Sequence, residues 1–188
     1  MNLIEELCFE DLTISDDNYR LYSKNTKNRY YYYNEIQNID KNKNRGSKKA
    51  TVIMINPSEA NEHFENKTPD NTINNLYNIL KSELNEVSAF EVINIYSQID
   101  PNPKMIYKQK VEKLNKNIIE KVLEKSEIVI PAWGIENKFN TEAQDLINDI
   151  KSLCKNKDVR VVINRYPCHF TTQCTSLGRN PAFIKYEF

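Results

Sequence analysis

The sequence predicts an α/β fold: a three-layer α/β/α sandwich around a four-stranded, mainly parallel sheet, preceded by a short basic β-hairpin region. Its 188 residues are the length of one domain with a substantial core. Apolar runs of strand length alternate with segments of helical periodicity from Thr51 to Ile163. The first of these runs, Thr51–Ile55, is continuously apolar, which is typical of a strand buried on both faces. We therefore expect a single domain over 1–188, with an N-terminal region over 1–49 and a core over 50–188.

The N-terminal region combines an acidic start with a basic block over 17–49. The block holds nine Lys or Arg against three acids, whereas the whole chain carries 26 of each and no net charge. Within it, Tyr19–Tyr22 and Tyr30–Tyr33 favour strands because aromatic residues suit a pleated surface. The Asn- and Lys-rich residues between them favour a turn, so the block predicts a hairpin.

The core then alternates strands and helices in order. Strands are expected at 51–55, 87–95, 127–130 and 159–163. Thr68 and Pro69 suit the cap and first position of one helix, a second helix follows Pro103, and a third begins at Thr141 with a capping-box pattern. Each helix has one apolar face. The three faces comprise Ile73, Leu76, Tyr77, Leu80 and Leu84; Val111, Leu114, Ile118 and Val122; and Leu146, Ile147, Ile150 and Leu153.

Polar and aromatic residues follow each predicted strand. Because ligands of open parallel sheets bind beyond the carboxyl ends of the strands, these positions are candidates for a site. The first strand leads into Asn56-Pro57-Ser58 and the second ends at Asn94-Ile95-Tyr96. The third leads into Trp133-Gly134 and the fourth into 164–169, which ends at His169. A carboxamide offers a donor and an acceptor on one plane, which suits recognition of a hydrogen-bonding heterocycle.

Each of these positions also has a purely structural interpretation. Asn56-Pro57 can be a turn that ends a strand, Trp133-Gly134 can be packing plus a turn, and His169 can be an ordinary loop histidine. Asn94 is different, since it lies inside an apolar strand and a buried amide without partners costs about 1–3 kcal/mol. The position of Asn94 therefore favours a functional role for its side chain over a structural one.

Other chemistries are disfavoured by missing patterns. The chain has no phosphate-binding G-x-x-x-x-G-K-[ST] loop, no dinucleotide G-x-G-x-x-G and no hydrolase G-x-S-x-G. Cys168, His169 and Cys174 suggest zinc only weakly, because no C-x-x-C pair is present and a fourth ligand would come from remote Cys154, Cys8 or His63. We expect neither a metal nor another cofactor.

The cysteines and the hydropathy also bear on location. Four widely spaced cysteines fit a reducing compartment better than a disulfide framework. The start of the chain is acidic, and no apolar run approaches the roughly 20 residues that cross a bilayer. We expect a cytoplasmic protein without a membrane partner.

Four short motifs resemble a known family. Ile55–Ala60, Asp70–Ile73, Val92–Tyr96 and Ala132–Gly134 occur in the order and spacing of the bacterial and phage family called domain of unknown function 1643. The resemblance spans about 19–183. The family's name carries no activity.

The strand ends also resemble, more distantly, the uracil-DNA glycosylase superfamily, whose fold is a four-stranded parallel α/β/α sandwich. That resemblance implies that Asn56 orients a water molecule, that Asn94 reads the edge of a base, and that Ala132-Trp133-Gly134 stands where a Leu-Trp-Gly motif occurs. The last motif, usually His-Pro-Ser or Asn-Pro-Ser, departs from the pattern. Both Pro167-Cys168-His169 and Asn180-Pro181-Ala182 are candidates for it.

The resemblance implies hydrolysis of the N-glycosidic bond of a base flipped out of its stack. Three groups of residues follow from it and from the local charge. The expected catalytic residues are Asn56, His169 and Asn180; the base-binding residues are Asn94, Phe64, Tyr96 and Trp133; and the residues that contact the nucleic-acid backbone are Ser58, Lys41, Lys43, Arg45, Arg165 and Arg179.

Two other function classes stay open. The missing carboxylate at position 56 and the disturbed last motif favour a non-catalytic module that binds a nucleotide or nucleic acid, and the basic block can equally be a solvated face. A third interpretation is a structural interaction protein that uses Tyr30–Tyr33 as an exposed edge strand. The sequence does not predict an oligomeric state, and the expected partner is a nucleic acid or nucleotide.

Overall fold

In the part of the chain that the computed structural model describes, one mixed sheet has eight strands in the order β1-β2-β3-β5-β4-β6-β7-β8. The structure describes residues 6–7, 12–14, 20–36, 45–57, 71–100, 105, 107–162 and 182–188. The strands are β1 (Leu12–Ile14), β2 (Arg20–Ser23), β3 (Arg29–Glu35), β4 (Lys48–Met54), β5 (Val87–Asn94), β6 (Ile128–Pro131), β7 (Asp158–Val162) and β8 (Phe183–Lys185).

The centre of this sheet is parallel, as the apolar runs predict. β4 pairs in parallel with both β5 and β6, and β6 pairs in parallel with β7. The expected count of four strands is too low, because antiparallel strands extend both sides: β1, β2 and β3 beyond β5, and β8 beyond β7. β1 and β8 have three residues each, too few for a recognisable hydrophobic period.

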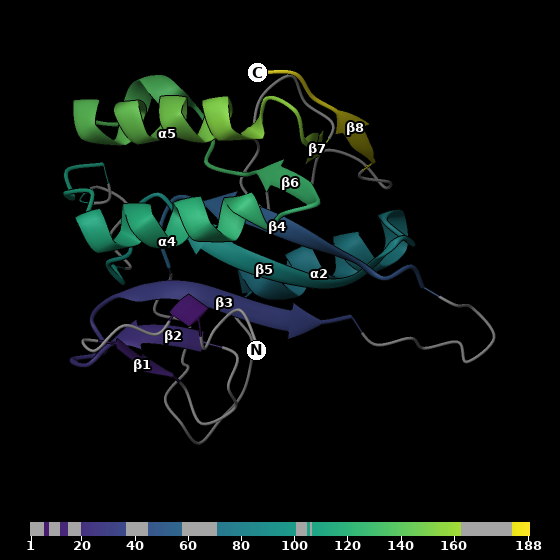
Figure 1. The fold of residues 1–188 in the computed structure, drawn as a ribbon, viewed down its shortest axis with the longest axis horizontal. Coiled ribbons are helices and arrows are strands. Elements are labelled where there is room, and N and C mark those ends of the chain that lie inside the picture. Colours follow the sequence, from purple (N-terminus) through teal and green to yellow (C-terminus); the bar gives the residue numbers. More distant parts are fainter. Residues whose placement is uncertain are drawn as a thin grey trace.

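Helices cover both faces of the sheet (Figure 1), which makes the α/β layering explicit. The helices are α2 (Asn71–Glu83), α4 (Lys113–Glu124) and α5 (Thr141–Cys154), with a short 3-10 turn, η1 (Glu136–Lys138). α2 packs on one face against Val52, Phe90 and Val92. α4 and α5 pack on the other face against residues such as Ile53 and Ile93. Neighbouring strand residues alternate between these two cores, as the pleat requires.

Two details of the helices differ from the sequence prediction. α5 is capped by Asn140, whose Oδ1 accepts a hydrogen bond from the Ala143 amide at 3.0 Å, so the cap lies one residue before Thr141. Leu153 is 41% exposed, and Cys154 is buried in its place. The helical period near the end of α5 allowed either residue to face the core. The predicted helix start at Thr68-Pro69 lies outside the described residues.

The predicted hairpin is confirmed and belongs to the main sheet. β2 and β3 pair antiparallel, and β3 also pairs antiparallel with β5. Because β3 has a partner on each side, the interpretation of Tyr30–Tyr33 as an exposed edge strand is wrong. In the described residues of the chain, no helix is long and apolar enough to span a membrane.

A buried carboxylate ties the hairpin to the parallel strands. Glu91 on β5 is fully buried and accepts hydrogen bonds from the Tyr31 hydroxyl at 2.8 Å and from Thr51 Oγ1 at 2.6 Å. Lys49 Nζ lies 2.6 Å from the same carboxylate. Burial raises the pKa of the Tyr31 hydroxyl well above its usual range. This network fixes β3, β5 and β4 against one another and, with them, the strand ends described next.

Candidate functional site at the carboxyl edge of the parallel strands

The carboxyl ends of β4, β5 and β6 meet where the chain connections diverge. β4 leads towards α2 on one face, whereas β5 and β6 lead towards α4 and α5 on the other. The three ends are level, since Met54 pairs with Asn94 and Ile53 with Pro131. Pairing continues past the strands, because Tyr96 N donates to Ile55 O at 2.8 Å. Such a switch point is the usual place for a ligand in an open α/β sheet.

Asn56 is held in one orientation at this edge. Its Nδ2 donates to the backbone carbonyl of Asp100 at 2.9 Å and to that of Pro57 at 3.1 Å. Both amide protons are thereby used within the protein. Within the part of the chain that the structure describes, Oδ1 accepts no hydrogen bond, and its direction is set by the two bonds to Nδ2.

Asn94 closes β5 opposite Met54, which lies two residues before Asn56 in the chain, and is only 2% exposed. In the described residues its side chain makes no hydrogen bond, although its backbone is firmly held. Asn115 Nδ2 donates to the carbonyls of Asn94 at 2.9 Å and Ile95 at 3.0 Å. Asn115 is fully buried, and its own Oδ1 accepts no hydrogen bond from described residues. Two buried amides with unused capacity lie at one strand end, which is unusual for a purely structural element.

A chain of polar contacts links the three strand exits. Asp100, whose carbonyl holds Asn56, accepts a hydrogen bond from Gln109 Nε2 at 3.4 Å through Oδ2. The Gln109 carbonyl accepts from Asn140 Nδ2 at 2.7 Å, and Asn140 is the cap of α5. The exit of β4, the exit of β5 and the start of α5 are therefore joined by hydrogen bonds, which stiffens the edge.

A second cluster surrounds the carboxylate of Glu112, the residue just before α4. Its Oε2 accepts from the Tyr30 hydroxyl at 2.8 Å and from Ser97 Oγ at 2.9 Å, and its Oε1 accepts from Asn28 Nδ2 at 3.2 Å. Burial and the neighbouring carboxylate raise the pKa of Tyr30 well above its usual range. With three donors on its oxygens, Glu112 acts as a clamp between the hairpin, the β5 exit and α4 rather than as an available base.

Two predicted base-binding residues lie in the core instead of lining an open edge. Tyr96 is fully buried, stacks on Phe139 with ring centroids 6.0 Å apart, and has a pKa raised by burial to about 12. Trp133 is also fully buried; its indole N–H donates to Glu136 at 3.3 Å and its ring stacks on Phe188. Neither ring is placed to stack on a ligand without rearrangement, so we leave both out of the candidate site.

Arg45, predicted to contact phosphate, is engaged within the fold. Its guanidinium donates four hydrogen bonds, to the carbonyls of Leu80, Lys81, Leu84 and Val87, at 2.8 to 3.0 Å. These carbonyls end α2 and begin β5, so Arg45 caps a helix at the opposite edge of the sheet. The other predicted site residues lie outside the described residues: Ser58, Phe64, Lys41, Lys43, Arg165, His169, Arg179 and Asn180.

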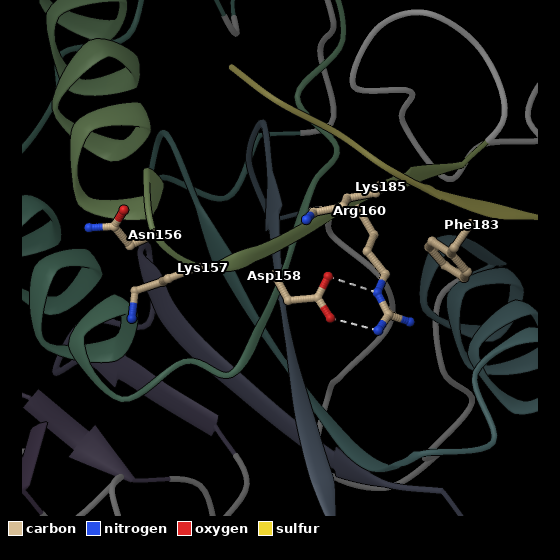
Figure 2. Close-up of a pocket in the computed structure, with 6 residues that line it drawn as sticks. All are labelled: Asn156, Lys157, Asp158, Arg160, Phe183 and Lys185. Atoms are coloured by element: carbon tan, nitrogen blue, oxygen red, sulfur yellow. Dashed lines mark hydrogen bonds and ion pairs between the residues drawn. The ribbon is translucent and has the colours of Figure 1, made fainter.

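A groove of about 610 Å³ lies at the amino end of β7, far along the sheet from the candidate site (Figure 2). Three of its four charged side chains, Lys157, Asp158 and Arg160, are already paired within the protein. Arg160 donates to both carboxylate oxygens of Asp158 at 3.0 and 2.6 Å and to Glu86 at 2.6 Å. Lys157 Nζ donates to two carbonyls at the end of α4. Because the charges face one another rather than the open space, the carboxyl edge is the better candidate despite the size of the groove.

The described residues offer little for metal or thiol chemistry. No group of three or more His, Cys, Asp or Glu side chains is placed among them to hold a metal ion. Cys154 is buried, and burial raises the pKa of its thiol to about 11. Cys8, Cys168, His63 and Cys174, which carried the zinc alternative, lie outside the described residues.

Sequence reasoning missed four residues of this edge: Asp100, Gln109, Glu112 and Asn115. Asn115 did carry a signal, since it interrupts the apolar face of the helix that contains Ile118 and Val122. The others gave none, because their partners are up to 84 positions away in the chain.

The fold and the edge define a class: an α/β/α protein whose strand ends present neutral carboxamides at a switch point. The family model for "Protein of unknown function (DUF1643)" matches residues 29–169, and the chain belongs to this family. Comparisons with curated proteins and with solved structures find no match.

Proposed function

We propose that this protein recognises a base of a nucleic acid at the carboxyl edge of its parallel strands and hydrolyses the bond between that base and its sugar. The observation that carries the proposal is the pair of amides at adjacent strand ends. Asn56 is oriented by two hydrogen bonds, and Asn94 is nearly buried with its side chain unused in the described residues. A neutral amide pairs with a base edge without the desolvation cost of a charge.

The role proposed for each residue follows from the hydrogen-bonding atoms that its contacts within the protein leave unused. Asn94 donates to and accepts from the edge of a base that has left its stack. Asn56 Oδ1 accepts a hydrogen bond from a water molecule and aims its oxygen at the sugar C1′. As the C1′–O bond forms, the C1′–N bond breaks and the base leaves with the bonding electrons. An amide takes up no proton, so the proton of the water passes to solvent or to the departing base, and we expect slow turnover.

The proposal draws its fold argument from the resemblance to uracil-DNA glycosylases. That resemblance implies four parallel strands with helices on both faces and polar residues at the strand ends, and the sheet described above has this layering. His169 and Asn180 remain the proposed donors to the departing base. Fold similarity hosts many functions, so the activity depends on the amides and not on the architecture.

A non-catalytic base-binding module is the second candidate, and one observation favours it. Glu112, a carboxylate near this edge, already accepts three hydrogen bonds, and residue 56 is an amide rather than a carboxylate. Neither group is therefore available to deprotonate a water molecule. In that case the same edge binds a base and releases it unchanged.

The test is a strand-cleavage assay. Labelled oligonucleotides carrying uracil, mispaired thymine, or an oxidised or hydroxymethylated pyrimidine are incubated with protein and then treated with alkali. We expect alkali-dependent cleavage by the wild type, reduced about 100-fold or more in Asn56→Ala and Asn94→Ala, the size of effect seen when one positioned hydrogen-bonding group is removed elsewhere.

Asn117→Ala serves as the matched control, since Asn117 is an exposed asparagine on α4. It should cleave like the wild type, and thermal unfolding should show that all variants fold. Binding without cleavage across the panel would favour the non-catalytic module. Absence of binding would contradict both candidates.

A further inference from the structure

The hairpin turn and the residues before α4 present a set of lysines beside the candidate site. Lys24 and Lys27 lie in the turn between β2 and β3, Lys108 and Lys110 precede α4, and Lys113 is its first residue. All five side chains are exposed. We call this set the lysine surface. It differs from the backbone contacts expected from the basic block, which were Lys41, Lys43 and Arg45.

Contacts between distant segments bring these lysines to one side of the molecule. The Ile99 amide donates to the Lys27 carbonyl at 2.9 Å, and Asn28 forms a β-bridge with Gln98. Asn28 Nδ2 then reaches Glu112 at 3.2 Å, next to Lys113. The turn, the β5 exit and the start of α4 are thus joined through single contacts, so the three groups of lysines flank the segment that holds Asn56.

Two of the carboxylates in this region are engaged within the protein, whereas Glu142 is exposed and accepts a hydrogen bond from the Val111 amide at 3.3 Å. Glu112 is half-buried and occupied by three donors, and Asp100 Oδ2 accepts a hydrogen bond from Gln109 at 3.4 Å. No lysine of the surface forms an ion pair with a described residue, whereas Lys49, Lys116, Lys125 and Lys151 each pair with a carboxylate. The positive charge of the surface is therefore left for an outside partner, in a chain with no net charge.

We propose that the lysine surface binds the phosphodiester backbone of a nucleic-acid strand and delivers it to the amides at the carboxyl edge. The reason is proximity. The surface adjoins Ser97–Asp100, and the Asp100 carbonyl holds Asn56. Exposed lysines without ion pairs suit phosphates, because they release condensed counterions from the strand when they bind. This inference rests on the proposed function for the identity of the polyanion, but the surface makes a prediction of its own.

The experiment measures binding of a fluorescently labelled 20-nucleotide DNA, as a single strand and as a duplex, against salt concentration. The test variant Lys27→Gln/Lys110→Gln/Lys113→Gln takes one lysine from each segment. The control variant Lys48→Gln/Lys155→Gln/Lys185→Gln removes the same charge from exposed lysines elsewhere. Both triple variants should keep the wild-type unfolding temperature, because only exposed side chains change.

We expect the test variant to flatten the slope of log K against log salt by about 2 for the single strand and about 3 for the duplex, and the control to leave it unchanged. Affinity at 100 mM salt should fall at least about tenfold in the test variant. The form of DNA that shows the larger loss identifies the preferred partner. Equal slopes and affinities for the two triple variants would overturn the proposal.

The two proposals fail in different ways. If DNA binding depends on the lysines but no base is released, the proposal for the lysine surface holds and the proposed glycosylase activity is wrong. If the protein releases a base at saturating concentration but the test variant binds DNA as tightly as the wild type, the glycosylase activity holds and the proposal for the lysine surface is wrong. A wild type that binds neither form of DNA would overturn the surface as well.

Discussion

The two edges of the parallel sheet hold polar residues in opposite ways. At the amino edge, several charged groups are paired with one another or with backbone: Arg160 with Asp158 (Figure 2) and with Glu86, and Arg45 with the carbonyls that end α2. At the carboxyl edge, Asn56, Asn94 and Asn115 are neutral amides, and each is left with hydrogen-bonding atoms that the described residues do not use.

This difference separates stability from recognition. Groups whose bonds are all made within the protein contribute to folding, and a ligand would have to break those bonds to use them. Groups held by one atom and open at another are oriented for a ligand in advance, which lowers the cost of binding. The volume of a groove, such as the one at the amino edge, is therefore a poorer guide to a binding site than the number of its polar atoms that are still free to bond a ligand.

Removing Arg45 should give the largest effect on stability. In Arg45→Ala four carbonyls lose their donor and the end of α2 loses a compensating cation, so we expect the free energy of unfolding to fall by about 2–3 kcal/mol. Urea unfolding measures it, with Lys48→Ala as an exposed control that should change it by under about 0.5 kcal/mol. A normal stability combined with lost DNA affinity would instead show that Arg45 contacts phosphate and that the amino edge also takes part in binding.

Substitution of two glycines, one at each edge of the sheet, should have an intermediate effect on the free energy of unfolding. A Cβ added at Gly46 would lie 2.4 Å from the Glu86 carbonyl oxygen, in a backbone contact that cannot yield easily. Gly134, after β6, has φ of +81° with open space around it. We expect Gly46→Ala to cost about 1–3 kcal/mol through overpacking and Gly134→Ala about 1–2 kcal/mol through backbone strain alone.

Thermal unfolding of the two glycine variants checks the order. Substituting Gly134 by Asn, which tolerates a left-handed backbone better, should recover part of the loss. Asn at Gly46 should not, since its Cβ meets the same carbonyl. Equal recovery at both positions would contradict the distinction between crowding and strain.

The smallest effect concerns pH at the amino edge. Arg160 holds the pKa values of Asp158 and Glu86 below their usual range, chiefly through its hydrogen bonds to them. A carboxyl group with a lowered folded pKa contributes stability above its unfolded pKa and loses it as the pH falls through the folded value. Because both carboxyls are about a third exposed, we expect about 1 kcal/mol or less.

Arg160→Met removes this contribution, so the stability difference between wild type and variant should be present at pH 7 and shrink below about pH 4. Chemical unfolding at a series of pH values measures it. Ligand binding at the carboxyl edge should not follow the same curve, since amides do not titrate. A binding profile that parallels the stability profile would show that the two edges are coupled.

The parallel sheet was predictable because each of its strands is a local pattern. Thr51–Ile55 is apolar on both faces, Val87–Ile95 is mostly apolar, and helices with one apolar face follow them, so β4, β5, α2 and α4 follow from short windows of sequence. β1 and β8 were not predictable, because three residues hold no period. The first residue of α5, Thr141, was predicted correctly, but its cap was off by one, since Asn140 and Thr141 are both good caps and only the bond to Ala143 decides between them.

The amides at positions 56 and 94 were identified from their place after strands, but their chemical state was not. Trp133 and Tyr96 occur in equally suggestive places and turn out to be core residues. Arg45 belongs to a conspicuous run of positive charge, yet it caps α2. A charge or an aromatic ring in the sequence indicates what a side chain can bind, and only the neighbours in space determine whether that capacity is already used.

The alternation of strands and helices in the core, the parallel centre of the sheet and the position of Asn56 and Asn94 at the same edge were all encoded in local sequence. Those features depend on hydrophobic period and on the rule that parallel strands end together. Only the tertiary structure decided that Glu112 clamps the hairpin to α4, that Asn115 holds the end of β5, and that lysines from three segments share one surface. The reason is that these contacts join residues far apart in the chain, whose pairing no local pattern encodes.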